Sequence, residues 1–256
     1  MSTGSLILIP NTLDLGLNPG PLDEVLPAGV IRRAAALTHW AAEDAKTARA
    51  FLKRVDALVP LALPLQSIAI TELPRARKGS REPVPPAEWQ ALLAPALAGH
   101  DLGLISEAGL PAVADPGAAL VAAAHAAGVT VVPLSGPSSL LLALAASGLN
   151  GQSFAFVGYL PQEPAARVAR IRELEALSRR LQQTQLVIET PYRNTALLGS
   201  LLETLAPATR LSVSAGLTVE GGFTRSAAVS DWRRQSATQP GTLPDRVPAV
   251  FALLAG

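Results

Sequence analysis

The chain has 256 residues, a formal net charge of +1 and no cysteine. The missing cysteines exclude disulfides, thiolate catalysis and cysteine-ligated zinc or iron–sulfur sites, and the net charge alone implies no acidic partner. Hydrophobic residues make up 49% of the chain but aromatic residues only 4%, so we expect a core of Leu, Ala and Val.

Apolar runs alternate with helical patterns along the chain, which predicts an α/β protein. In the first half the predicted strands cover residues 5–10, 68–71, 102–105 and 129–132, and the helices cover 44–58, 87–97 and a segment that begins at the Asp115-Pro116 pair. In the second half the predicted strands cover 154–157, 186–189, 211–215 and 247–254, and the helices cover 163–183 and 194–205. A turn-rich junction at 150–153 predicts an N-terminal α/β domain over residues 1–150 and a C-terminal α/β domain over residues 151–256.

Two loops of small residues follow predicted strands and lead into helices rich in Ala and Leu. They lie within residues 102–117 (LGLISEAGLPAVADPG) and residues 131–149 (VVPLSGPSSLLLALAASGL). Small residues past the carboxyl end of a strand let a ligand approach the backbone closely. The pair of loops therefore predicts a small bound cofactor.

Several common signatures are absent from the sequence. There is no G-x-G-x-x-G, no G-x-x-x-x-G-K-[ST], no G-x-S-x-G and no H-E-x-x-H, and the three histidines are dispersed. This favours a cofactor without phosphates and no metal. The start of the chain does not read as a signal peptide, and the apolar runs are shorter than a membrane span, so we expect a cytoplasmic protein with no membrane partner.

Four motifs together resemble the tetrapyrrole methylase superfamily, the class III S-adenosylmethionine methyltransferases. The nearest resemblance is to the branch of the 16S rRNA ribose 2′-O-methyltransferase I. Residues 106–117 (SEAGLPAVADPG) are similar to its S-D-A-G-x-P-x-x-x-D-P-G, and residues 41–46 (AAEDAK) to its A-A-E-D-T-R. Residues 156–161 (FVGYLP) are similar to F-x-G-F-L-P, and residues 188–193 (IETPYR) to Y-E-S-P-H-R.

The chain departs from the family pattern at three loops. The family's T-P-I-G-N is here Ile9-Pro10-Asn11-Thr12, the threonine of E-D-T-R is Ala45, and A-R-E-L-T-K is replaced at residues 215–220 by AGLTVE. These loops border the cleft of the family, so the acceptor follows less directly from the resemblance than the methyl-transfer chemistry does.

The resemblance implies two α/β domains with S-adenosyl-L-methionine in a cofactor cleft between them. It places the following residues around the cofactor: Pro10, Leu110, Val113, Ser138, Ser139, Thr190, Ala215 and Pro248. Ser138 and Ser139 begin a predicted helix, where hydroxyls and free amides suit a carboxylate. An alternative is that these residues are only connectors in tight turns.

Methyl transfer from a sulfonium depends mostly on orientation of the reacting atoms. An oxygen acceptor can require proton removal, and Glu43 is the candidate catalytic base. An acid at a helix N-terminus is the competing interpretation of Glu43. Glu107 and Glu189 are alternatives, and a base is not required by the chemistry.

Arginine and lysine cluster in three segments that can grip RNA phosphates, although a solvated face is the commoner explanation of such clusters. The clusters are Arg75, Arg77, Lys78 and Arg81; Arg167, Arg170, Arg172, Arg179 and Arg180; and Arg225, Arg233 and Arg234. Trp40 and Trp89 flank apolar helical segments and are expected to be packing residues.

We therefore expect an S-adenosylmethionine-dependent methyltransferase, a homodimer as in its relatives, that acts on a ribose 2′-hydroxyl of ribosomal RNA in the small subunit. Two alternatives stay open: a small-molecule methylase of the tetrapyrrole type, and a non-catalytic module that binds S-adenosylmethionine.

Overall fold

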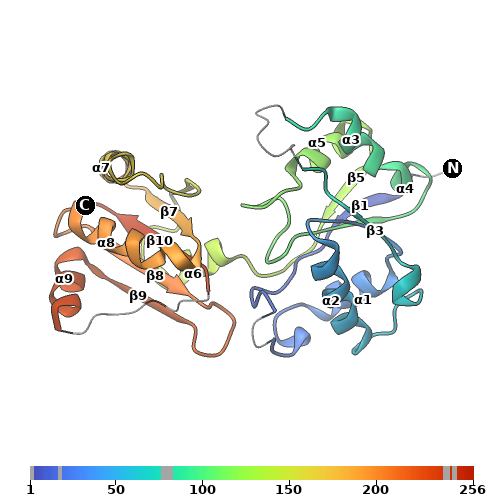
Figure 1. Cartoon of the computed structure of the whole chain (residues 1–256), viewed down its shortest axis with the longest axis horizontal. Coiled ribbons are helices and arrows are strands. Elements are labelled where there is room, and N and C mark those ends of the chain that lie inside the picture. Colours follow the sequence, from blue (N-terminus) through green and yellow to red (C-terminus); the bar gives the residue numbers. More distant parts are fainter. Residues whose placement is uncertain (1–2, 17–18, 76–82, 239–242, 244–246) are drawn as a thin grey trace. The chain divides into compact units, whose positions relative to one another are not determined.

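The computed structural model describes residues 3–16, 19–75, 83–238, 243 and 247–256. The chain forms two compact units, Met1–Pro137 and Ser138–Gly256, and each contains one five-stranded sheet. Figure 1 shows both units with most of their helices and strands labelled. The predicted α/β class is confirmed.

The first unit contains a parallel sheet in the order β3-β2-β4-β1-β5. Its strands are β1 (Ser5–Leu8), β2 (His39–Ala42), β3 (Ala69–Glu72), β4 (Leu102–Ile105) and β5 (Thr130–Pro133). Because β4 lies between β1 and β2, the loops that follow these three strands are neighbours at the carboxyl edge of the sheet.

Helices cover both faces of this sheet. They are α1 (Ala28–Ala36), α2 (Ala45–Asp56), α3 (Pro86–Leu92), α4 (Ala94–Leu97) and α5 (Ala118–Ala126), with short 3₁₀ turns η1 (Leu22–Glu24) and η2 (Leu65–Ser67). Successive residues of a strand point to opposite faces. Accordingly Ile7 packs in one cluster with Val30 of α1 and Leu52 of α2, whereas Leu6 packs in another with Leu120 of α5.

The second unit contains a mixed sheet in the order β6-β7-β10-β8-β9. Its strands are β6 (Phe154–Phe156), β7 (Thr184–Glu189), β8 (Arg210–Ala215), β9 (Phe223–Ala228) and β10 (Ala249–Leu254), and its helices are α6 (Ser139–Ser147), α7 (Pro164–Leu181), α8 (Asn194–Thr204) and α9 (Val229–Thr238), with the turn η3 (Pro191–Arg193). Strand β6 is parallel to β7, and the other neighbouring pairs are antiparallel.

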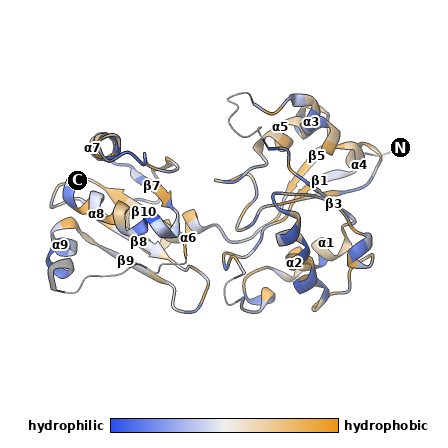
Figure 2. Ribbon diagram, in the orientation of Figure 1, coloured by the Kyte–Doolittle hydropathy of each residue, from blue (hydrophilic) through white to orange (hydrophobic). Residues whose placement is uncertain are grey.

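Helices also cover both faces of the second sheet. Phe251 of β10 packs with residues of α7, α8 and α9, whereas the next residue back, Val250, packs with Leu140 and Leu144 of α6. The strands of the sheets are largely hydrophobic, and hydrophilic residues are prominent on α2 and α7 (Figure 2).

The boundary between the units lies at Pro137 and Ser138 rather than at residue 150. The reason is α6, which the sequence assigned to the first domain but which packs on β8, β9 and β10. Its C-terminal end is also bound to the second sheet, since Arg210 donates to the carbonyl of Gly148 over 3.1 Å.

Two local expectations need correction, and four elements were missed. Helix α5 begins at Ala118 rather than at Asp115, because Gly117, with φ 129°, is its N-cap and the segment before it stays irregular. The helix expected over 87–97 is two helices that meet at Leu93, because Pro95 cannot donate in a continuous helix. Strands β2 and β9 and helices α1 and α9 were not predicted.

Along the described part of the chain, no helix is long and apolar enough to cross a membrane.

Candidate functional site

Asn11 ties together two loops at the carboxyl edge of the first sheet. Its amide nitrogen Nδ2 donates to the carbonyl oxygens of Ser106, at 3.2 Å, and Glu107, at 2.9 Å. Its Oδ1 accepts from the backbone N–H of Thr12 at 2.8 Å. Asn11 is only 4% exposed, so these bonds are shielded from water and fix the loop after β1 against the loop after β4.

The loop after β1 is also held by α2. Arg54 forms an ion pair with Asp14 at 3.1 Å and donates to the hydroxyl of Thr12 at 3.2 Å. The loop at residues 9–12, which departs from the family's T-P-I-G-N, is therefore held by contacts with α2.

The loop after β5 approaches the loop after β1 at Gly136. A Cβ atom on Gly136 would overlap the ring of Pro10. Only glycine permits this approach, so the Ser-Gly-Pro turn places backbone directly against Pro10, one of the predicted cofactor residues.

The loop after β4 contains residues in the left-handed backbone region. These include Gly109, Ala112 and Ala114, with φ values of 66°, 66° and 65°. The two alanines adopt a conformation that is unfavourable for residues with a Cβ, a kind of strain that is concentrated at functional sites. In this loop Leu110 is half-buried and Val113 is 43% exposed.

Three carboxylates gather at this edge from two loops. Glu43 follows β2, and Glu107 and Asp115 lie in the loop after β4. Glu43 Oε2 accepts from the backbone N–H of Glu107 at 3.1 Å, and Arg75 donates to the carbonyl of Glu43 at 2.8 Å. Among the described residues, no group of His, Asp and Glu has an arrangement that could hold a metal ion.

Burial and neighbouring charges raise the pKa of two of these carboxyl groups, Glu107 and Asp115. Burial, together with the charges of Glu43 and Glu107, raises the pKa of Asp115 to about 7. Burial and the neighbouring charges of Glu43 and Asp44 also raise the pKa of Glu107, and Arg75 opposes this. Near neutral pH the carboxyl group of Asp115 is therefore present both in its protonated form, which can donate a hydrogen bond, and in its ionised form, which only accepts.

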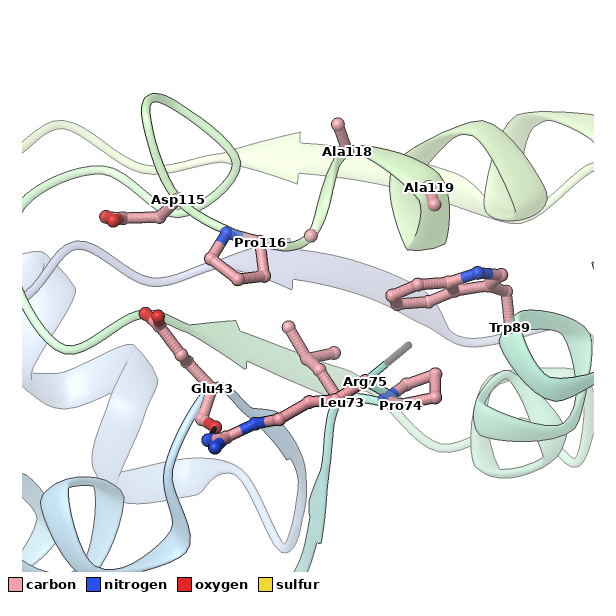
Figure 3. A pocket seen from close by; sticks show the side chains of 10 residues that line it. Glu43, Leu73, Pro74, Arg75, Trp89, Asp115, Pro116, Ala118 and Ala119 are labelled. Atoms are coloured by element: carbon pink, nitrogen blue, oxygen red, sulfur yellow. Dashed lines mark hydrogen bonds between the residues drawn. The ribbon is translucent and has the colours of Figure 1, made fainter. Parts of the chain in front are cut away.

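A pocket of about 470 Å³ opens beside these carboxylates, entirely within the first unit. Figure 3 shows Glu43 and Asp115 with their carboxyl groups at one end and the indole of Trp89 at the other. Leu73 and Pro74 lie between these ends, and Ala118 and Ala119 lie across from Trp89. Trp40 is fully buried and is a packing residue as expected, whereas the half-buried Trp89 also lines this pocket.

In the second unit, strand register brings three predicted cofactor residues together. Ala249 of β10 pairs with Glu189 of β7 and with Ala215 of β8. Thr190 follows Glu189 and Pro248 precedes Ala249, so Thr190, Ala215 and Pro248 lie at the same end of the sheet.

Ser138 and Ser139 form the N-terminal end of α6 in the same unit. Ser138 is the N-cap residue and is 8% exposed, and its side chain makes no capping hydrogen bond to the helix. Leu217, which follows β8, packs in the same cluster as Leu140 of α6. The start of α6 and the sheet end with Thr190, Ala215 and Pro248 therefore belong to the same unit.

Glu189 is engaged in the structure of the second unit. It forms a 2.8 Å ion pair with Arg193, and its Oε1 accepts from the backbone N–H of Thr190 at 2.8 Å. The carboxylate is 1% exposed. These contacts hold Glu189 in the turn after β7, whereas the carboxylates that line the pocket are Glu43 and Asp115.

The cofactor-binding role of the predicted residues stays a prediction. The structure places Pro10, Leu110 and Val113 in loops of the first unit, and the other five at one helix start and one sheet end of the second unit. Sequence reasoning named Arg75 only as part of a basic cluster and missed Asn11, Trp89 and Asp115 as site residues, although the position of Asp115 in the loop after a buried strand was a usable signal.

The sequence profile of the Tetrapyrrole (Corrin/Porphyrin) Methylases matches residues 29–227. The chain belongs to the tetrapyrrole methylase family. The resemblance inferred from the four motifs is thereby confirmed.

Curated relatives of this tetrapyrrole methylase carry the name Ribosomal RNA small subunit methyltransferase I. The relative from Pseudomonas aeruginosa is 32% identical over 207 residues, which are 80% of this chain and 61% of the relative. The relative from Vibrio cholerae is 40% identical over 116 residues, 45% of this chain and 39% of the relative. The matches thus span less than two thirds of these relatives' length.

Solved structures share the fold of this tetrapyrrole methylase. The methyltransferase CobJ matches with a TM-score of 0.55 and 17% identity, covering 99% of this chain and 95% of that chain. The uroporphyrin III C-methyl transferase from Thermus thermophilus matches with a TM-score of 0.55 and 18% identity, covering 98% and 97%.

Proposed function

We propose that this chain is an S-adenosyl-L-methionine-dependent methyltransferase that acts on a ribose 2′-hydroxyl of small-subunit ribosomal RNA. The observation that carries the proposal is the match along 80% of the chain to a relative named Ribosomal RNA small subunit methyltransferase I, within a family of methylases.

The residues of each unit fit the parts of this cofactor. In the first unit, the half-buried backbone of Gly136 lies directly against Pro10, and the hydroxyl of Ser106 is buried without a hydrogen-bond partner. In the second unit, the uncommitted Ser138 side chain stands at a helix start, which favours a carboxylate. We assign Pro10, Leu110 and Val113 of the first unit to the cofactor, together with Ser138, Ser139, Thr190, Ala215 and Pro248 of the second.

The chemistry required of the side chains is modest. The bound cofactor supplies a methyl group already activated on a sulfonium, so the protein mainly orients the acceptor. We propose Glu43 as the general base that takes the proton of the attacking hydroxyl. The N–H of Glu107 holds its carboxylate, which faces the pocket, and this position fits the role (Figure 3).

The basic residues support RNA binding only in part, because several are used within the fold. Arg233 donates to the carbonyls of Leu202 and Leu205, and Arg225 stacks on Trp232 at 3.8 Å. Arg170 is paired with Glu173. Arg77, Lys78 and Arg81 lie outside the described residues, so Arg75 is the member of its cluster that the structure places at the pocket.

We also propose a cytoplasmic homodimer as the working form. Small-subunit RNA as acceptor supports the location, and the family resemblance supports the dimer. Sedimentation equilibrium of the purified chain should give twice the 26.4 kDa monomer mass. A monomer mass at micromolar concentration would contradict the dimer.

The test uses methyl-tritiated S-adenosylmethionine and three acceptors: small ribosomal subunits from cells that lack this protein, naked small-subunit RNA, and a porphyrinogen. Label in RNA that nuclease digestion assigns to a 2′-O-methyl nucleoside supports the proposal. Label only in the porphyrinogen would show a small-molecule methylase. Calorimetric binding of S-adenosylhomocysteine without label in any acceptor would show a non-catalytic binding module.

A further inference from the structure

We propose that the pocket between Trp89 and the carboxylates Glu43 and Asp115 binds the acceptor ribonucleotide, with its base on the indole and its ribose 2′-hydroxyl at the carboxylates. This inference rests on the proposed function and deepens it. It assigns the acceptor to a site within the first unit.

A nucleoside has an apolar, planar base and a polar ribose, and the two ends of the pocket differ in the same way. One end is apolar, where Trp89 faces Ala118 and Ala119 across the opening (Figure 3). Because both alanines are small, they leave space for a planar ring on the indole face. A base stacked on an aromatic side chain gains affinity whatever its identity, since every base has a π face.

The other end offers acceptors for hydroxyl and amino donors. The carboxyl groups of Glu43 and Asp115 lie on the same side of the pocket, away from Trp89 (Figure 3). Within an RNA chain the 3′-oxygen is esterified, so the ribose offers its 2′-hydroxyl as a hydrogen-bond donor, and either carboxylate can accept from it. The proposed base, Glu43, is then at the end where the hydroxyl is bound.

Arg75 supplies the cation that a nucleotide needs beside these acids. One of its guanidinium nitrogens donates to the carbonyl of Glu43, and the side chain is exposed at the pocket. A guanidinium has five N–H donors, so this bond leaves others for a phosphate. The pocket volume of about 470 Å³ is within the range of small-ligand sites.

The test compares substitutions of Trp89 with a control on the same helix. Trp89→Ala removes the ring, Trp89→Leu keeps bulk without a π face, and Trp89→Phe keeps a smaller ring. Glu88→Gln is the matched control, because Glu88 is an exposed neighbour on α3 that does not line the pocket. The KM for small subunits and the Kd of S-adenosylhomocysteine are measured for each variant.

We expect the KM for the RNA substrate to rise about 10- to 100-fold in Trp89→Ala and Trp89→Leu, as loss of one stacking platform predicts. Trp89→Phe should restore most of the affinity, and Glu88→Gln should match the wild type. The Kd of S-adenosylhomocysteine should not change in any of them. Trp89→Leu keeps the test valid if Trp89→Ala fails to fold.

A second measurement separates this inference from the proposed function. Binding of the four ribonucleoside 5′-monophosphates and their 2′-deoxy forms is followed by saturation-transfer NMR. Weaker binding of the deoxy forms, and loss of binding in Trp89→Leu, support the site. If wild-type protein labels no RNA but shows this binding, the proposed function fails and the site stands. If wild-type protein labels RNA and Trp89→Leu has an unchanged KM, the site is overturned and the function stands.

Discussion

Replacement of Asn11 by alanine should destabilise the first unit by about 3 kcal/mol. The side chain makes three hydrogen bonds, two donated to loop carbonyls and one accepted from Thr12, and it is almost fully buried. A buried hydrogen bond contributes about 1 kcal/mol net, and a buried partner left unpaired costs about 1–3 kcal/mol. Three bonds lost together in a site closed to water give the expected sum.

Asn150 offers a matched control, because it also makes three hydrogen bonds. It donates to the carbonyl of Gln182 and accepts from the N–H groups of Gln152 and Ser153. These bonds are more exposed, so water can replace the lost partners. Asn150→Ala should therefore cost about 1 kcal/mol or less.

A charge introduced at position 11 gives a further check. In Asn11→Asp, a carboxylate would face the carbonyl oxygens of Ser106 and Glu107, to which it cannot donate. Its pKa in the folded state would be raised above the unfolded value. Such a group adds stability at low pH and loses it as pH rises through the folded pKa, so Asn11→Asp should be least stable at neutral pH and above.

The assay is hydrogen–deuterium exchange in increasing urea, read on peptides from each unit separately, because a chain of two units need not unfold in one step. Asn11→Ala should shift the midpoint for peptides of the first unit and leave those of the second unchanged. A loss below 1 kcal/mol, or an equal loss in Asn150→Ala, would refute the reasoning from burial.

Three other substitutions test separate parts of the structure. Gly136→Ala should cost about 1–3 kcal/mol of stability and weaken S-adenosylhomocysteine binding, because its Cβ would overlap Pro10. Thermal unfolding checks this. Gly151→Ala is the control, since a Cβ at that position meets no atom within 4 Å. Asp115→Asn should gain stability relative to wild type as pH rises from 3.8 to about 7. In this range the Asp115 carboxyl group keeps its proton in the folded wild type but has released it in the unfolded chain, so the wild type loses stability as pH rises. A difference in urea midpoint that does not change with pH would contradict this prediction. Ser138→Arg should abolish calorimetric binding of S-adenosylhomocysteine while circular dichroism stays unchanged, because the long side chain would fill the start of α6, and unchanged affinity would place the cofactor elsewhere.

Local sequence was sufficient for most elements of regular structure. Strand β4 was predicted with its observed bounds, and α7 within two residues at each end, because a buried apolar run and a long charged helix have strong patterns. Strand β2 escaped prediction because His39–Ala42 has neither a β-branched run nor alternation, and its pairing with β3 and β4 is what makes it a strand.

The amino-acid sequence by itself determined the α/β class and, through the order of four motifs, the methylase family. Motif residues are adjacent in the chain, so their identity can be recognised without knowing what they touch. The tertiary structure decided which unit α6 joins and that Asn11 bridges two loops. It also brought Glu43, Asp115 and Trp89 to one pocket, although the chain separates these residues widely. Such groupings depend on strand order and helix packing, which join distant segments, and no local pattern in a single sequence encodes that order.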